Sequence, residues 1–311
     1  MEYSEFWEMP RRAQIRVVAG ACGAARRRKH DMGTSQLVIL ILSFFLASSL
    51  SGQVVFSRRA YKELGPSYQQ IWIWNPSSGV LKALTHSPRN HFLPTCTGGK
   101  ITFVSSEEEW DDNSKLWSFD PASGEERVIG PPPMPPSHEP TPKNGCYAFA
   151  NAGSFEACGK DEDLSVSRAG KLIGQFNIQT NECPIDDRGT IGKCDTPILS
   201  LEWSPDAKWL LVGELGLNTN STAPQFDYYV VEAATMKLTK VASASEYDIL
   251  WLPGREELLY TTPEDLAPLP GARRERNVWV QQLILFDPAT GKSTAITSGV
   301  TNNFDASLCS R

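Results

Sequence analysis

Three carboxylates are the residues of this chain with the clearest potential for catalysis. Glu202, Asp248 and Asp305 each lie in or beside a short apolar run. Two carboxyl groups held about 5–10 Å apart can act as the acid and the nucleophile or base of glycoside hydrolysis. Spacing in the sequence alone does not bring two such groups together. Carboxylates at strand ends and turns are therefore the simpler interpretation, and hydrolysis is the alternative.

Other catalytic chemistry has weaker support in the residue pattern. The sequence contains neither G-x-S-x-G nor H-E-x-x-H, which are the usual contexts of a serine nucleophile and a zinc protease. No C-x-x-C spacing is present, so a zinc site is not expected. Gly291-Lys292-Ser293-Thr294 resembles the end of a phosphate loop, but the first glycine of that motif is missing. We predict no cofactor and no metal.

Charged residues in polar stretches indicate binding rather than catalysis. An acidic block, Glu107–Asp112, and a basic block, Arg273–Arg276, each interrupt the apolar pattern, and a pair of arginines opens a third polar stretch. A surface built from these stretches could bind a partner, although solvated loop tips are the simpler explanation of charge blocks. The predicted binding residues are Arg58, Arg59, Glu107, Glu109, Trp110, Asp111, Arg273 and Arg274.

A repeated hairpin must position these residues. One layout is shared by Gln70–Thr85, Lys115–Gly124 and Gln282–Gly291: an apolar run, then Asn/Asp-Pro-x-Ser/Thr-Gly, and after it a second short strand. Proline suits the first corner of a tight turn, and glycine takes the left-handed position that closes it. In a fourth unit we expect Ala234-Thr235 at this position. The first copies recur after about 45 residues, the period of a four-stranded propeller blade.

One family resembles this pattern. Trp203-Ser204-Pro205-Asp206-Ala207-Lys208, together with Ile71–Asn75 and Leu84-Thr85, is similar to the TolB-type, WD-like β-propeller repeat of bacterial envelope proteins. The resemblance covers about residues 54–309. It implies an all-β propeller of four-stranded blades. We expect five blades, or six if residues 177–196 conceal strands, with the C-terminal strand, 303–309, closing the ring inside the first blade.

The long polar stretches then join the second and third strands of the blades. They are 58–69, 107–113, 151–161, 216–225 and 263–277. In a propeller such loops lie on one face, which is the usual binding face of a repeat array. We expect the charged residues above to line this face and the three carboxylates to lie near the channel.

The first 51 residues are expected to be an N-terminal extension with a signal peptide, and 52–311 a single propeller domain. Arg26–Lys29 precedes an apolar core at 37–50 that is followed by small residues. This basic, apolar, small order is typical of a secretory signal. The apolar core is shorter than the roughly 20 residues that span a membrane. We predict a periplasmic or secreted protein; an uncleaved signal anchor is the alternative.

Six cysteines follow the leader, an even number that suggests disulfides in an exported chain. Cys183 and Cys194 flank one polar loop, and Cys146 and Cys158 flank another, so these are the candidate pairs. Cys96 and Cys309 are expected on the first strands of neighbouring blades.

Charge and composition favour a binding protein. The net charge is −6, which argues against nucleic acid as a partner because that interaction needs a basic face. We therefore expect an exported, monomeric, non-catalytic propeller that binds a protein or a cell-envelope component through its loop face. The alternative is a glycan-binding or glycoside-hydrolase-like propeller that uses the carboxylates.

Overall fold

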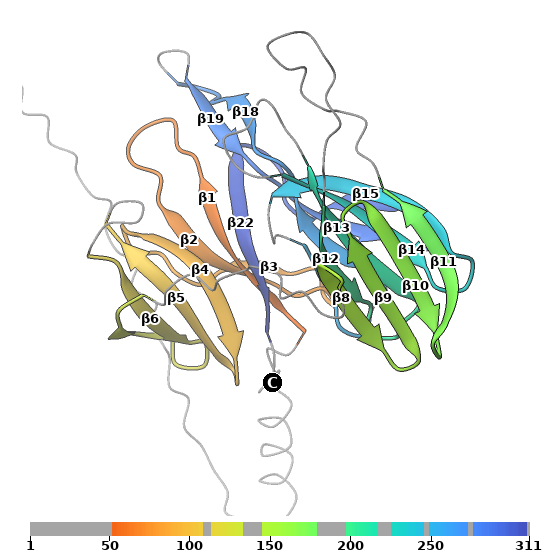
Figure 1. Ribbon diagram of the computed structural model, residues 1–311. Coiled ribbons are helices and arrows are strands. Elements are labelled where there is room, and N and C mark those ends of the chain that lie inside the picture. Colours follow the sequence, from red (N-terminus) through yellow and green to blue (C-terminus); the bar gives the residue numbers. More distant parts are fainter. Residues whose placement is uncertain are drawn as a thin grey trace, which may run out of the picture. The chain divides into compact units, whose positions relative to one another are not determined.

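The computed structural model describes residues 52–107, 113–132, 145–178, 197–216, 225–245, 249–272 and 276–309. The regular elements of these residues are 22 β-strands. They form five four-stranded antiparallel sheets and one two-stranded ribbon (Figure 1). The predicted all-β fold of four-stranded sheets is therefore confirmed for this part of the chain. No helix among the described residues is long and apolar enough to cross a membrane.

The first sheet joins the two ends of the described chain. Its order is β22 (Thr301–Leu308), β1 (Val54–Ala60), β2 (Gln69–Trp74) and β3 (Leu81–Ala83). β22 runs antiparallel to β1 over nearly its whole length. The expected pairing of the C-terminal strand with the first strand is thus confirmed.

The other sheets follow the sequence, strand by strand. The second sheet contains β4 (Asn90–Thr97), β5 (Lys100–Ser106), β6 (Lys115–Asp120) and β7 (Glu125–Gly130). The third contains β8 (Ala148–Ala152), β9 (Phe155–Lys160), β10 (Asp163–Arg168) and β11 (Lys171–Asn177). The fourth contains β12 (Ile198–Trp203), β13 (Trp209–Gly216), β14 (Gln225–Glu232) and β15 (Lys237–Ser245). The fifth contains β16 (Ile249–Trp251), β17 (Leu258–Thr261), β20 (Leu283–Asp287) and β21 (Lys292–Ala295), and the ribbon pairs β18 (Asp265–Pro268) with β19 (Asn277–Val280).

Two of the predicted loops contain strands. The stretch 151–161 holds β9, and its connection to β8 is a tight turn at Gly153, where φ is +59°. The buried positions of β9 are occupied by small residues, Ala157 and Gly159. The sequence of β9 therefore lacks the alternation of large apolar and polar residues that predicts a strand. Gly159 is small because the next sheet packs against it: a Cβ there would lie 2.7 Å from the Ile198 side chain. The stretch 263–277 holds most of the β18–β19 ribbon, which was not predicted either.

The hairpin turns form as expected in three sheets. Gly79, Gly124 and Gly291 have φ near +70°, and each donates its N–H to the carbonyl of the Asn or Asp four residues earlier. In the fourth sheet the prediction of Ala234-Thr235 is wrong, because Met236 takes the left-handed position with φ of +56°. Met236 belongs there because its side chain packs against β11, where a Cβ on Gly174 would lie 2.7 Å from the Met236 sulfur.

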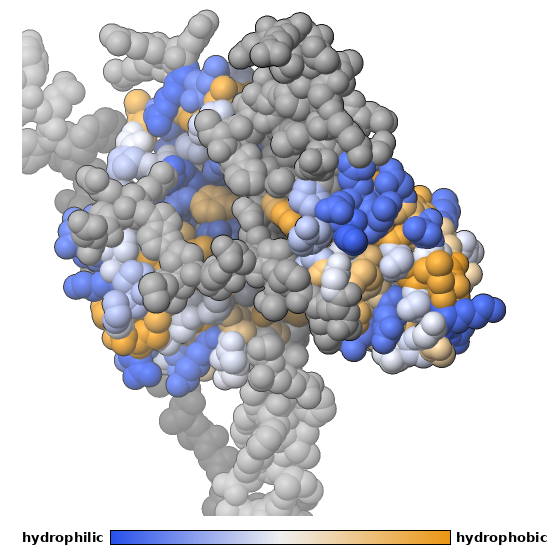
Figure 2. All heavy atoms as spheres, viewed as in Figure 1, coloured by the Kyte–Doolittle hydropathy of each residue, from blue (hydrophilic) through white to orange (hydrophobic). Residues whose placement is uncertain are grey.

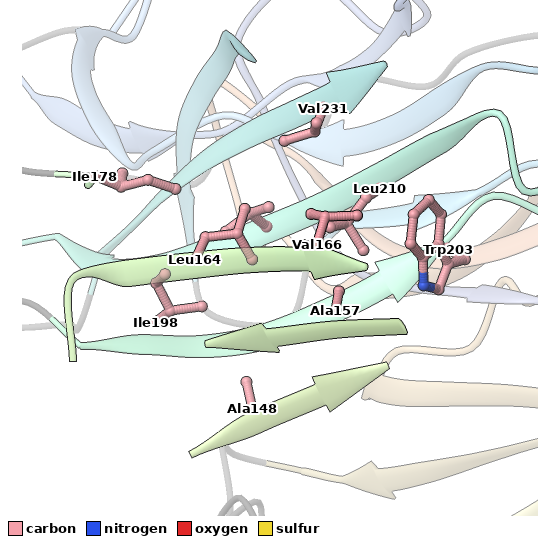
Figure 3. Close-up of a cluster of buried hydrophobic side chains, with 10 residues drawn as sticks. Ala148, Ala157, Leu164, Val166, Ile178, Ile198, Trp203, Leu210 and Val231 are labelled. Carbon is pink, nitrogen blue, oxygen red and sulfur yellow. The ribbon is translucent and has the colours of Figure 1, made fainter. Parts of the chain in front are cut away.

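Apolar side chains fill four of the spaces between consecutive sheets. Figure 3 shows one such cluster, in which Leu164 and Val166 of the third sheet meet Ile198 and Leu210 of the fourth. Equivalent clusters lie between the fourth and fifth sheets, the fifth and first, and the first and second. No cluster of described residues joins the second sheet to the third. The described sheets thus form a packed series in the order third, fourth, fifth, first and second.

Candidate functional site

Buried polar side chains gather at one end of the sheets. This end, called the loop face here, carries the β1–β2, β5–β6, β13–β14 and β17–β20 connections and the starts of β4 and β22. The side chains of Gln69, Asn90, Thr261, Asn302 and Asn303 are each at most 9 % exposed there. In the view of Figure 2 the surface of the described residues mixes hydrophilic and apolar side chains. The buried polar groups therefore support the loops rather than form the outer surface.

A glutamine and a threonine close the hairpin of the first sheet. The hydroxyl of Thr85 accepts a hydrogen bond from the Ile71 amide (2.9 Å) and donates to the side-chain oxygen of Gln70 (3.0 Å). The side-chain NH2 group of Gln70 then donates to the backbone carbonyl groups of Ser87 and Arg89, both at 3.0 Å. The pair thus holds the segment that leads into the next sheet.

The fifth sheet repeats this arrangement with other residues. Thr297 accepts from the Leu283 amide (2.9 Å) and donates to Gln282 (2.8 Å). Gln282 in turn donates to the Gly299 carbonyl at 2.9 Å. We call the two pairs the Gln–Thr clamps. In both clamps the threonine hydroxyl accepts a backbone N–H, and this explains why these two repeats end on threonine. The sequence pattern alone did not provide this reason.

The C-terminal strand is held by the segment after the ribbon as well as by β1. Besides its pairing with β1, β22 is hydrogen-bonded to the segment after β19: the Gln281 amide donates to Thr301 and the Asn303 amide donates to Gln281, both at 3.2 Å. The Asn303 side chain, which is fully buried, also donates to the Gln281 carbonyl. The ribbon is therefore rooted on the first sheet.

Two disulfides are present among the described residues. Cys96 of β4 is bonded to Cys309 after β22, with a sequence separation of 213. Cys146 is bonded to Cys158, so this predicted pair is confirmed. The bond between the first and second sheets was not predicted, although both cysteines were expected on first strands of neighbouring blades. The predicted pair Cys183–Cys194 lies outside the described residues.

Asp305 is used to join two strands. Its carboxylate accepts hydrogen bonds from the Leu93 amide (2.9 Å) on β4 and from the Ser57 hydroxyl (3.4 Å) on β1. Leu93 and Asp305 both have positive φ, +50° and +55°, at places where their strand registers shift. Burial raises the pKa of Asp305 above its ordinary value. Its polar contacts are all structural.

Two of the three predicted carboxylates, Glu202 and Asp305, lie in the described residues, and a catalytic pair among the three stays a prediction. Glu202 lies on β12 with an exposed side chain, and burial of its surroundings raises the pKa of its carboxyl group. The hydrogen bonds of the Asp305 carboxylate go to Leu93 and Ser57 and not to Glu202. Asp248 lies outside the described residues. Glu202 thus combines a raised pKa with an exposed side chain.

His91 is a buried histidine that sequence reasoning did not select. Its Nε2 lies 2.7 Å from the Ser87 hydroxyl, and its ring meets Phe103 edge-on at 4.9 Å between centroids. Burial, assisted by the positive charge of Arg89, lowers the pKa of His91 to about 4. A neutral imidazole beside a serine resembles a nucleophile and base. Its Nδ1 has no hydrogen-bond partner that could orient it, so a packing role is the better explanation.

The predicted loop-face charges differ in their surroundings. Arg58 lies over the ring of Trp72, with the guanidinium carbon 4.5 Å from the ring centroid. Arg59 points toward the side-chain oxygen of Asn90, at 3.5 Å. Glu107 forms an exposed ion pair with Arg89, also at 3.5 Å. The other predicted binding residues lie outside the described residues: Glu109, Trp110, Asp111, Arg273 and Arg274.

No group of His, Cys, Asp or Glu side chains suited to a metal ion occurs in the described parts of the chain. The sites that the structure does offer are a loop face with half-buried cations and the projecting ribbon. Such groups can bind a partner, and nothing among them assembles a nucleophile with its base and an oxyanion site.

Comparison with known proteins adds only distant likenesses. No family model matches the sequence, and no curated protein matches it. Among solved structures, TolB from Acinetobacter baumannii is 14% identical and aligns over 83% of this chain and 57% of its own, with a TM-score of 0.26. A candidate 6-phosphogluconolactonase from Bacteroides fragilis is 13% identical over 83% of this chain and 99% of its own, with a TM-score of 0.28. An oligogalacturonate lyase in complex with manganese is 10% identical over 72% of this chain and 58% of its own, with a TM-score of 0.25.

Proposed function

We propose that the protein is an exported, non-catalytic β-propeller of the TolB type that binds a protein or a cell-envelope component through its loop face. The observation that carries the proposal is the β18–β19 ribbon. Leu266 and Trp279 are cross-strand partners on it, and they are 49% and 50% exposed. Adjacent large apolar side chains on a rooted hairpin are typical of a binding surface.

Export has its own support. Two disulfides among the described residues fit an oxidising compartment, and the leader has the order of a secretory signal. We propose that the sheets close into five blades around an axis. The shared first sheet and the clamps support this arrangement, since they would hold consecutive blades together.

The glycan-active alternative depends on Glu202. An exposed carboxyl group with a raised pKa suits a general acid. A second carboxylate would have to come from residues outside the described ranges.

The test is capture of a partner from the native envelope extract by the mature chain, 52–311. We expect the wild-type chain to retain a specific partner and Leu266→Ala with Trp279→Ala to lose at least about ten-fold of it, as is usual for aromatic anchors. Leu172→Ala with Ile173→Ala is the matched control, because these residues are also exposed but lie on β11.

Capture that is equal for wild type and the ribbon variant would contradict the proposal. Hydrolysis of an envelope polysaccharide that disappears in Glu202→Gln would favour the alternative function instead.

A further inference from the structure

Arg58 is a partly buried cation that has no anionic partner among the described residues. It lies near the end of β1, just before the β1–β2 loop, and its guanidinium packs on Trp72 of β2. The Nε atom is buried and has no hydrogen-bond acceptor. Arg58 makes neither an ion pair nor a hydrogen bond with the described residues, and burial lowers its pKa from the ordinary value.

The fold does not require a cation at this position. Arg58 is opposite Gln70 in the first sheet. The corresponding residue of the second sheet is Ser105, opposite Lys115, and that of the fifth sheet is Thr262, which is hydrogen-bonded to Gln282. Small hydroxyl residues therefore serve the same place in two other sheets. Arg58 must be explained by something other than the repeat.

A bound anion would explain it. Burial of a charge without a partner has an unfavourable free energy of desolvation. Binding of an opposite charge offsets this free energy. The guanidinium of Arg58 lies over the indole ring of Trp72, and the N–H edge of a guanidinium matches the two oxygens of a carboxylate. One cation balances a singly charged carboxylate. A phosphate monoester carries close to two negative charges at neutral pH and would need a second cation. The adjacent Arg59 is oriented toward Asn90 instead.

We propose that Arg58 and Trp72 form a carboxylate-binding site that takes an acidic side chain of the partner protein. The site rests on the proposed function, because it lies on the loop face and names the chemistry that this face recognises. Trp72 packs against the guanidinium, and Arg58 supplies paired N–H donors. The ribbon would contribute apolar contacts to the same partner.

The test measures binding of a blocked hexaglutamate peptide to the mature chain at low ionic strength, with the hexaglutamine peptide as the neutral probe. We expect Arg58→Gln to weaken hexaglutamate binding at least about ten-fold, as for loss of a charge-assisted pair. Arg58→Lys should also weaken it, because an ammonium lacks the planar fork. Arg168→Gln is the matched control: Arg168 also stacks on a ring, that of Phe155 at 5.1 Å, and the change in net charge is the same.

Three results would overturn the site: no hexaglutamate binding by the wild-type chain, equal binding by Arg58→Gln, or displacement of the peptide by an equal concentration of inorganic phosphate. Capture from the envelope extract separates this inference from the proposed function. If Arg58→Gln captures the partner as well as wild type, the function stands and the site fails. If the peptide result holds but no partner is captured by any variant, the site stands and the function fails.

Discussion

The first and fifth sheets differ from the second in how their last strands end. The hairpins of the first and fifth sheets carry the Gln–Thr clamps, which tie the outgoing segment to the sheet it leaves. In the second sheet Lys115 and Gly130 occupy the corresponding positions, so the clamp has neither its glutamine nor its threonine. The clamped sheets are followed by a sheet that packs against them, and the second sheet shares no apolar cluster with the third within the described residues.

The difference shows that formation of the hairpin and attachment of one sheet to the next depend on different residues. The second sheet has the same turn, with the Gly124 amide bonded to the Asp120 carbonyl at 2.7 Å. Its strands pair fully. A sheet can therefore form without a clamp, and the clamp acts on the segment between one sheet and the next. The fourth sheet uses a related pair, in which the Ser243 hydroxyl donates to Asp227.

The largest effect should come from the covalent tie between the first and second sheets. Replacing Cys96 and Cys309 by serine should lower the free energy of unfolding by about 5 kcal/mol, since the loop-entropy model gives the largest contribution to long loops. The Cys146–Cys158 bond closes a segment with a separation of only 12, so the same double replacement there should cost about 3 kcal/mol. Urea unfolding of the two double variants measures the difference. Equal losses would show that loop length does not set the contribution.

His91 should make the stability of the protein sensitive to acid. Its folded pKa is depressed to about 4, below the 6.5 of the unfolded chain, so the unfolded state binds more protons between these values. Stability is then present above pH 6.5 and is lost as pH falls toward 4, by about 3 kcal/mol in total. His91→Gln should remove this dependence in urea unfolding between pH 4 and 7. His86→Gln, at an exposed residue shortly before β4, should leave it unchanged.

Loss of a clamp should have an intermediate effect. Thr297→Val leaves the buried Leu283 amide without its acceptor, which should cost about 2 kcal/mol. Thr294→Val is the control, because Thr294 is exposed on β21. Thermal unfolding measures both variants. If Thr297→Val is as stable as the control, the hydroxyl does not hold the segment.

The smallest effect should come from grafting a clamp onto the second sheet. Lys115→Gln with Gly130→Thr should raise the free energy of unfolding by about 1 kcal/mol, partly because glycine is replaced at a strand position. Nothing lies within 4 Å of a Cβ at Gly130, so the new side chain fits. Gly130→Ala alone separates the backbone contribution from that of the hydroxyl. A double variant no more stable than Gly130→Ala would show that the clamp needs further residues.

Local sequence patterns were sufficient to predict the four-stranded sheets but not the contacts of the candidate site. The Asn/Asp-Pro-x-Ser/Thr-Gly turn fixes backbone geometry within a few residues, so the hairpins could be predicted. β9 was missed because Ala157 and Gly159 carry little apolar surface. Met236 was missed because its positive φ is compensated by packing against another sheet, a contact that no local pattern contains.

The site depends on register and on distance between sheets. Arg58 was selected by its charge, but its stacking on Trp72 follows from the pairing of β1 with β2. Cys96 and Cys309 were expected on the first strands of neighbouring blades, yet their bond spans 213 residues of sequence, so spacing gave no indication of it. Glu202 and Asp305 were selected together because both are carboxylates in or beside short apolar runs. In the structure the Asp305 carboxylate is hydrogen-bonded to Leu93 and Ser57, whereas the Glu202 side chain is exposed.

The bond between Cys96 and Cys309 also has a consequence for oxidation during biosynthesis. Cys96 emerges well before its partner, and Cys146 and Cys158 follow it while Cys309 is still to be made. An oxidant that joins cysteines in order of appearance would link the wrong pair. Correct maturation then requires thiol–disulfide exchange, in which a thiolate attacks the mispaired bond. A compartment that contains a disulfide isomerase would supply this step, and production without one should yield a mixture of disulfide isomers.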